Sequence, residues 1–108
     1  MESQAEEQRE DVEIAKIIIK KYGINAQFAK IGEELNELAI QCMKAVSSGH
    51  VDYRNMAEEI ADVRFVMLQL MLIMNEQSGQ DGWFEDLVDT NYNYKVHRTL
   101  DLLNMNAG

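Results

Sequence analysis

The chain has 108 residues, of which 46% are hydrophobic and 27% charged, as in one ordinary globular domain. Its formal net charge of −9 argues against wrapping a nucleic-acid backbone, which requires clustered Lys and Arg, so we expect no nucleic-acid partner. The most apolar run, Val63 to Met74, is interrupted by Arg64 and Gln69. It is shorter than the roughly 20 residues of a membrane span, so we expect no membrane partner.

The first half of the sequence predicts two helices. The first runs over residues 4–21, and Gly23 follows its last turn as a stop signal. The second begins at Asn25, a plausible N-cap, and continues to about Val46. The polar residues 47–50 then break it.

The second half predicts further helices. Asp52 caps a helix that ends near Glu76, and a loop rich in Ser, Gly and Asp follows. Residues 83–88 form a short helix or an ordered loop, and a last helix covers residues 91–103, capped by Asp89 or Thr90. No segment alternates polar and apolar residues, so we expect an all-α fold: one domain over residues 1–108, a bundle of four to five helices.

The second and third helices each carry an apolar stripe at spacings of three and four, which predicts their core faces. The stripe of the second helix consists of Phe28, Ile31, Leu35, Leu38, Cys42 and Val46. The stripe of the third consists of Met56, Ile60, Val63, Met67, Leu70 and Met74. We interpret Cys42 as a small core residue in a reducing, cytoplasmic setting, because it has no cysteine partner and residues 1–11 are too polar for a signal peptide. The third helix is apolar around most of its circumference, which favours an oligomer.

Beside each apolar stripe lies a pair of carboxylates at i,i+3 spacing, Glu34 with Glu37 and Glu59 with Asp62. Residues that face each other across an antiparallel hairpin have position numbers with a constant sum. Pairing Glu34 with Asp62 and Glu37 with Glu59 gives the same sum, centred on the predicted turn. Four converging negative charges repel each other unless a cation lies among them. Oxygen ligands on rigid helices suit Mg²⁺, with Mn²⁺ as an alternative.

These acidic residues resemble the signature of the MazG-like, all-α nucleoside-triphosphate pyrophosphohydrolase superfamily. The similarity covers Glu33-Glu34-x-x-Glu37 and Glu59-x-x-Asp62, the preceding Gln27-Phe28-Ala29-Lys30, and the late Lys95-Val96-His97-Arg98. It extends over roughly residues 24–103. The resemblance implies a helical bundle that assembles as a homodimer or homotetramer. It also implies an enzyme that uses Mg²⁺ to cleave a nucleoside triphosphate between its α- and β-phosphates, giving a monophosphate and pyrophosphate.

Carried over to this sequence, the resemblance makes Glu34, Glu37, Glu59 and Asp62 the metal ligands. Lys30, Lys95 and Arg98 match basic positions that contact phosphates, and Gln27 belongs to the similar segment, so we count all four as substrate-binding residues. Lys95 and Arg98 share one helical face with Asn91. Glu37 is our candidate for the general base that takes a proton from the attacking water.

Base recognition calls for aromatic and polar side chains, and the candidates are Trp83, Tyr94, Asn91, Tyr92 and Phe28. Two alternatives stay open, and a third is disfavoured. The substrate can be phosphoribosyl-ATP, or specifically dUTP or dCTP. The chain can be a non-catalytic helical module whose third helix docks a partner. A di-metal oxidase or storage bundle is disfavoured, because the Glu-x-x-His spacing of such proteins is missing.

Overall fold

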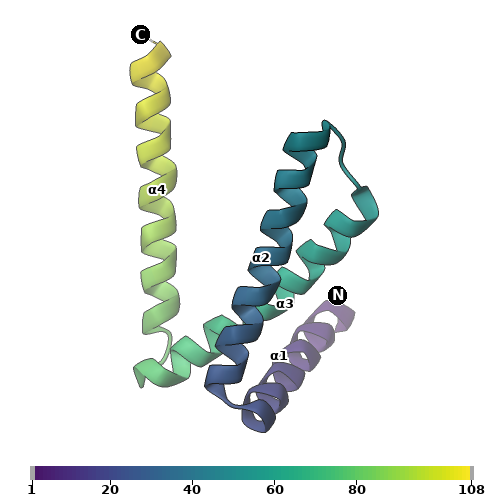
Figure 1. Cartoon of the computed structure of the whole chain (residues 1–108). Helices are drawn as coiled ribbons and strands as arrows, with labels where there is room; N and C mark the ends of the chain where they lie inside the picture. Colours follow the sequence, from purple (N-terminus) through teal and green to yellow (C-terminus); the bar gives the residue numbers. More distant parts are fainter. Residues whose placement is uncertain (1, 108) are drawn as a thin grey trace. The chain divides into compact units, whose positions relative to one another are not determined.

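The computed structural model describes the backbone of residues 2–107 and the side chains of residues 10–105. Within this range the chain forms four helices and no strands, which confirms the predicted all-α class (Figure 1). The helices are α1 (Glu2–Tyr22), α2 (Ile24–Ser48), α3 (Tyr53–Ser78) and α4 (Trp83–Ala107). None of the described helices is long and apolar enough to cross a membrane.

The junction between α1 and α2 is a single residue, Gly23. Its φ of 88° is a conformation that glycine adopts without steric cost, and its N–H donates to the carbonyl oxygen of Ile19 at 2.9 Å. The predicted stop at Gly23 is therefore confirmed. The predicted N-cap at Asn25 is wrong, because Gly23 turns the chain so abruptly that α2 begins at Ile24 and Asn25 already lies in its first turn.

The connection between α2 and α3 closes a helical hairpin. Gly49 ends α2 in the left-handed conformation (φ 72°), and its N–H donates to the carbonyl oxygen of Ala45 at 3.0 Å. Asp52 then caps α3 as predicted, since its Oδ1 accepts the N–H of Asn55 at 3.1 Å. These two caps fix where α2 stops and α3 starts, and so set the register of the hairpin.

The predicted break before residue 91 is wrong, because Trp83–Ala107 is one continuous helix. It begins where the N–H of Asp86 donates to the carbonyl oxygen of Gly82 at 3.0 Å. Glu85 and Asp86 lie in its first turn, where negative charge favours the helix dipole. Asp89 and Thr90 are good capping residues, but the chain contains no proline and nothing around them stops the helix.

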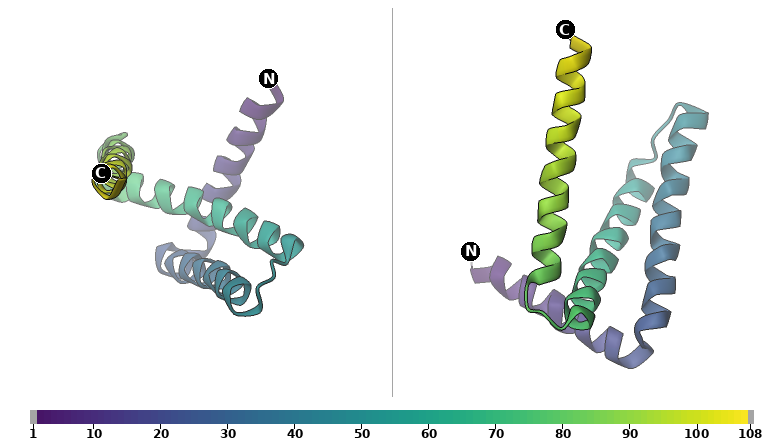
Figure 2. Two further views of the ribbon diagram at one scale, coloured as in Figure 1. Left: turned by 90° about the horizontal axis from the view of Figure 1, so that it is seen from above. Right: turned by 90° about the vertical axis from the view of Figure 1, so that its left-hand side faces the viewer.

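The chain divides into two compact units, Met1–Ile73 and Met74–Gly108, with the boundary inside α3. In the first unit α2 runs antiparallel to the part of α3 that ends at Ile73, and α1 lies across these two helices near the start of α2 (Figure 2). The small core of this unit consists of Ile31, Val66 and Ile73, against which Ile19, Ile24 and Leu70 pack.

The hairpin buries a different face from the one that the apolar stripes predicted. Its buried side chains are Gln27, Ile31 and Glu34 on α2 and Val66, Gln69 and Ile73 on α3. Of the predicted stripes only Ile31 is buried, whereas Leu35 and Ile60 remain 42% and 46% exposed. On α3 the buried residues lie on the stripe that carries the carboxylates, about 100° around the helix from the predicted face. On α2 they lie between the carboxylate stripe and the predicted apolar stripe, about 50° from the predicted face.

Cys42 is exposed, so its interpretation as a core residue is wrong. It belongs to the apolar stripe of α2, of which only Ile31 is buried. It also lies between Glu34 and the turn, where no residue of α2 is buried.

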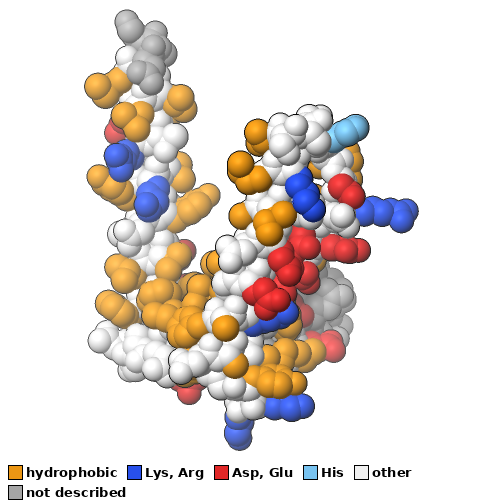
Figure 3. All heavy atoms as spheres, viewed as in Figure 1, with side chains coloured by type: hydrophobic (Ala, Val, Ile, Leu, Met, Phe, Trp, Pro, Cys, Tyr) orange, Lys and Arg blue, Asp and Glu red, His pale blue; other side chains and the backbone are white. Residues whose placement is uncertain are grey.

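The second unit contains the end of α3 and the whole of α4. The side chains of α4 are exposed from Glu85 to Met105, and many of them are apolar (Figure 3). The large exposed apolar residues of α4 are Trp83, Leu87, Val88, Tyr92, Tyr94, Val96, Leu100, Leu102, Leu103 and Met105.

Candidate metal centre

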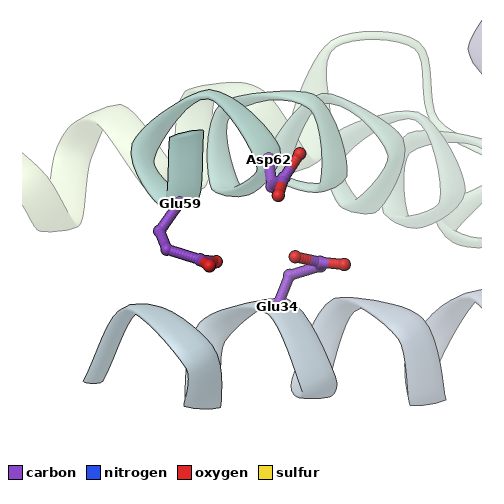
Figure 4. A group of neighbouring side chains, drawn as sticks. All are labelled: Glu34, Glu59 and Asp62. Carbon is purple, nitrogen blue, oxygen red and sulfur yellow. The ribbon is translucent and has the colours of Figure 1, made fainter. Parts of the chain in front are cut away.

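Three carboxylates converge between α2 and α3. Glu34 projects from α2, and Glu59 and Asp62 project from one face of α3, so that the three point toward one another (Figure 4). Each offers one carboxylate oxygen, and these three oxygens all lie within 4.8 Å of one another. Two predicted features produce this arrangement: the i,i+3 spacing on α3 and the register that sets Glu34 opposite Asp62.

The three carboxylates differ in burial. Glu34 is buried at 6% exposure, Glu59 is half-buried and Asp62 is exposed. The group is thus closed on the side of the hairpin core and open on the other. An ion or a ligand can reach it from solvent without unfolding the helices.

Two oxygens of this group are buried without a hydrogen-bond partner among the described residues, Glu34 Oε2 and Glu59 Oε2. The other oxygen of Glu34 forms an ion pair with Lys30, with Nζ to Oε1 at 2.9 Å. Buried carboxylate oxygens that lack donors are costly, because their lost hydration is not replaced. Acceptor-only oxygens that converge from two rigid helices fit a hard divalent cation such as Mg²⁺.

Glu37 lies outside the group of three but is affected by it. The negative charge of Glu34, one turn earlier, is the largest cause that raises the pKa of Glu37 above its ordinary value. Burial, the charges of Glu59 and Glu33 and a side-chain hydrogen bond to Glu34 raise this pKa further. Glu37 therefore holds its proton more firmly than a free glutamate and is a stronger base when ionised.

Lys30 forms an ion pair with Glu34, a member of the group of three carboxylates. Its hydrogen bond to Glu34 is the main cause that raises the pKa of Lys30, and the charges of Glu33, Glu34 and Glu37 add to it, while burial lowers it. The ammonium group thus stays protonated at the edge of the carboxylates. The i,i+4 pairing is geometrically ordinary for a helix, and half of the lysine side chain is exposed.

The remaining predicted site residues fall into two sets. Gln27 is buried on α2 at 5% exposure, on the same side of the helix as Glu34. Asn91, Lys95 and Arg98 lie on one face of α4, in the second unit, and all are exposed. The aromatic candidates of that unit, Trp83, Tyr92 and Tyr94, are also exposed.

Sequence reasoning missed one buried polar residue, Gln69. It is 3% exposed, and its Oε1 has no hydrogen-bond partner among the described residues. A signal was present in the sequence: Gln69 stands between Val66 and Ile73 on the stripe that continues from Glu59 and Asp62, and it is the polar residue of an otherwise apolar stretch.

Comparisons with protein-family models, with curated proteins and with solved structures find no match to this chain. The chemistry of the residues and the resemblance of the acidic signature are therefore the two indications of function.

Proposed function

We propose that this chain is a Mg²⁺-dependent nucleoside-triphosphate pyrophosphohydrolase that releases pyrophosphate and a nucleoside monophosphate. The observation that supports this proposal best is the convergence of Glu34, Glu59 and Asp62, two of which hold buried oxygens without donors. A net charge of −9 makes direct binding of a polyphosphate unfavourable, and a bound divalent cation removes that obstacle. Cleavage between the α- and β-phosphates is what the resemblance implies.

In this proposal Glu34, Glu59 and Asp62 hold the cation, and Glu37 either completes the ligand set or acts as the base. A divalent cation at this place supplies the positive charge that offsets a triphosphate and lowers the pKa of a water molecule. Mn²⁺ has similar ligand preferences and is an alternative.

The reaction is a displacement at the α-phosphorus. A bond forms between the water oxygen and this phosphorus, the bond to the bridging oxygen breaks, and pyrophosphate leaves with the electron pair of that bond. Glu37 is proposed to accept the proton of the water. Lys30 holds a positive charge one turn from the carboxylates, where it can bind a phosphate oxygen. Lys95 and Arg98 are proposed to bind the leaving pyrophosphate, and Asn91, Trp83 and Tyr94 are proposed as further substrate-binding residues.

We also propose that the protein acts as a homodimer or homotetramer. The hairpin leaves Leu35, Ile60 and Met67 substantially exposed, and α4 exposes many apolar side chains. Large apolar side chains exposed in such numbers are typical of subunit contacts.

The test is a pyrophosphate-release screen across nucleoside and deoxynucleoside triphosphates, including dUTP and dCTP, and phosphoribosyl-ATP. Each substrate is assayed with Mg²⁺, with Mn²⁺ and with EDTA. We expect monophosphate and pyrophosphate as products, no turnover in EDTA, and a loss of at least about 100-fold in kcat for Glu34→Gln and Glu59→Gln.

Glu58→Gln is the matched control, because Glu58 is the exposed neighbour of Glu59 and lies outside the group of three. It should retain wild-type turnover. Release of a diphosphate and inorganic phosphate, or turnover that EDTA leaves unchanged, would refute the proposal. The non-catalytic helical module would be favoured by two results together. The protein would turn over none of the substrates, and neither Mg²⁺ nor Glu59→Gln would change its free energy of unfolding.

A further inference from the structure

A cavity of about 550 Å³ adjoins the carboxylate group within the first unit. Its lining includes Glu34 and Asp62 of the group, together with Lys30 beside them. It thus shares a wall with the candidate metal centre. Its volume lies in the range of pockets that hold small organic ligands.

The cavity has a charged part and an apolar part. Its lining also includes two aromatic side chains, Tyr22 at the end of α1 and Phe65 on α3. Tyr22 is 59% exposed and Phe65 is half-buried, so both present ring surface that packing does not fully cover. Lys30 and a cation on the carboxylates, together with aromatic surface in the same cavity, match a molecule with an anionic group joined to a flat ring.

Two buried amides complete the lining, Gln27 on α2 and Gln69 on α3. They occupy opposite positions in the same hairpin register that sets Glu34 opposite Asp62. Glutamine is seldom this deeply buried, and Oε1 of Gln69 accepts no hydrogen bond from any described residue. A buried acceptor without a donor lowers stability. The packing of the hairpin does not supply a donor to Oε1 of Gln69, whereas a ligand in the cavity could.

We propose that this cavity holds the base of the nucleotide and that Gln69 determines base specificity. This inference rests on the proposed function. A rotation of the terminal amide lets Oε1 of Gln69 accept an N–H of the base and lets Nε2 donate to a neighbouring base acceptor. Glutamine forms such paired hydrogen bonds with nucleobase edges, adenine being the familiar case. Tyr22 and Phe65 stack on the ring, and the triphosphate extends toward Lys30 and the carboxylates.

This assignment differs from the aromatic candidates that the sequence suggested. Phe28 is 43% exposed on α2 and is not among the residues that line the cavity, and Trp83 and Tyr94 belong to the second unit. Within the first unit, Tyr22 and Phe65 are the aromatic side chains that the cavity brings to the carboxylates.

The test measures binding rather than turnover. Calorimetric titrations in Mg²⁺ compare the α,β-methylene analogues of the four deoxynucleoside triphosphates, which resist cleavage, with inorganic tripolyphosphate, which has no base. We expect one or two nucleotides to bind the wild-type protein more tightly than tripolyphosphate. Gln69→Met should weaken that binding by about 10- to 100-fold and leave tripolyphosphate binding unchanged.

Two further variants complete the design. Phe65→Leu keeps an apolar side chain but removes the stacking ring, so it should weaken all four nucleotides several-fold and spare tripolyphosphate. Gln77→Met is the matched control, an exposed glutamine on the same helix outside the cavity. It should bind every ligand as the wild-type protein does.

The outcomes separate this inference from the proposed function. If the wild-type protein binds nucleotides no better than tripolyphosphate, or if Gln69→Met weakens nucleotides and tripolyphosphate alike, the base site is refuted while a cation and phosphate site stands. If nucleotides bind through Gln69 but no natural triphosphate releases pyrophosphate, hydrolysis is refuted while the base site stands.

Discussion

Neutralising Glu59 should stabilise the metal-free protein, although it removes a proposed ligand. Carboxylate oxygens of Glu59 and Glu34 lie within 4.8 Å of each other, and each residue also holds a buried oxygen without a partner. Two unit charges at this separation repel by about 3 kcal/mol at an effective dielectric constant of 20 and by about 1 kcal/mol in water. Because Glu59 is half-buried, we expect Glu59→Gln to raise the free energy of unfolding by about 1–3 kcal/mol in EDTA.

Mg²⁺ should reverse the order of the two proteins. A ligand that binds only the folded state stabilises it by about 2.7 kcal/mol at one hundred times its dissociation constant. The wild-type protein should gain this stability, and Glu59→Gln should gain little. In EDTA the variant should melt about 5–15 °C above the wild type, and saturating Mg²⁺ should close or invert that gap.

The assay is urea and thermal unfolding followed by circular dichroism, with EDTA and with increasing Mg²⁺. Glu58→Gln removes the same charge from an exposed position outside the group, so it should change the unfolding free energy by less than about 0.5 kcal/mol. A Glu59→Gln protein that is less stable than wild type in EDTA, or equal stabilisation of both by Mg²⁺, refutes the reasoning.

Three more predictions concern pH, a helix end and assembly. Because the pKa of Glu37 is raised in the folded state, folding takes up a proton, and the unfolding free energy of the metal-free protein should fall as pH rises from the ordinary glutamate range through that raised pKa. In urea titrations Glu37→Gln should flatten this part of the pH profile. An identical profile for the two proteins would count against the charge cluster. Gly49→Ala places a Cβ at φ 72° and should lower the unfolding free energy by about 1 kcal/mol. Gly32→Ala, inside α2 with open space at its Cβ, should raise the unfolding free energy by about 0.5–1 kcal/mol. A Gly49→Ala protein as stable as the wild type would show that the end of α2 does not depend on glycine. Light scattering at micromolar concentration should report a dimer or a tetramer, and a monomer there would contradict the role given to the exposed apolar faces.

Much of the first unit could be predicted because its signals are local. Gly23 ends one helix, and Asp52 starts another through its own hydrogen bond to Asn55. Once the hairpin turn was located, helical periodicity and the pairing of opposite positions were enough to bring Glu34, Glu59 and Asp62 together. No long-range information enters that argument, since a short loop and two straight helices determine the geometry.

The buried face of the hairpin could not be predicted in the same way. Apolar periodicity identifies the face that most needs covering, but it does not say what covers it. Leu35 and Ile60 lie on such faces and are exposed, whereas Gln27 and Gln69 are buried on the neighbouring faces. A rule based on hydrophobicity does not identify a polar residue that points inward, and this is why Gln69 was missed.

The fourth helix shows a different limit of the sequence. Asp89 and Thr90 have strong capping preferences, yet both are internal to α4. A capping residue ends a helix only where the backbone also leaves the helical conformation, and the structure has glycines at positive φ at residues 79 and 82, before Trp83, and none after it up to residue 107.

The site's three carboxylates come from two helices that are adjacent in the sequence and joined by residues 49–52. Closing so short a segment costs little chain entropy, so the approach of these helices is opposed mainly by their own charges. Under the proposed function, binding of a divalent ion should therefore change the rate of hairpin docking as well as the equilibrium. The nascent chain can complete this step before α4 is available, provided that the ion is present when the helices first meet.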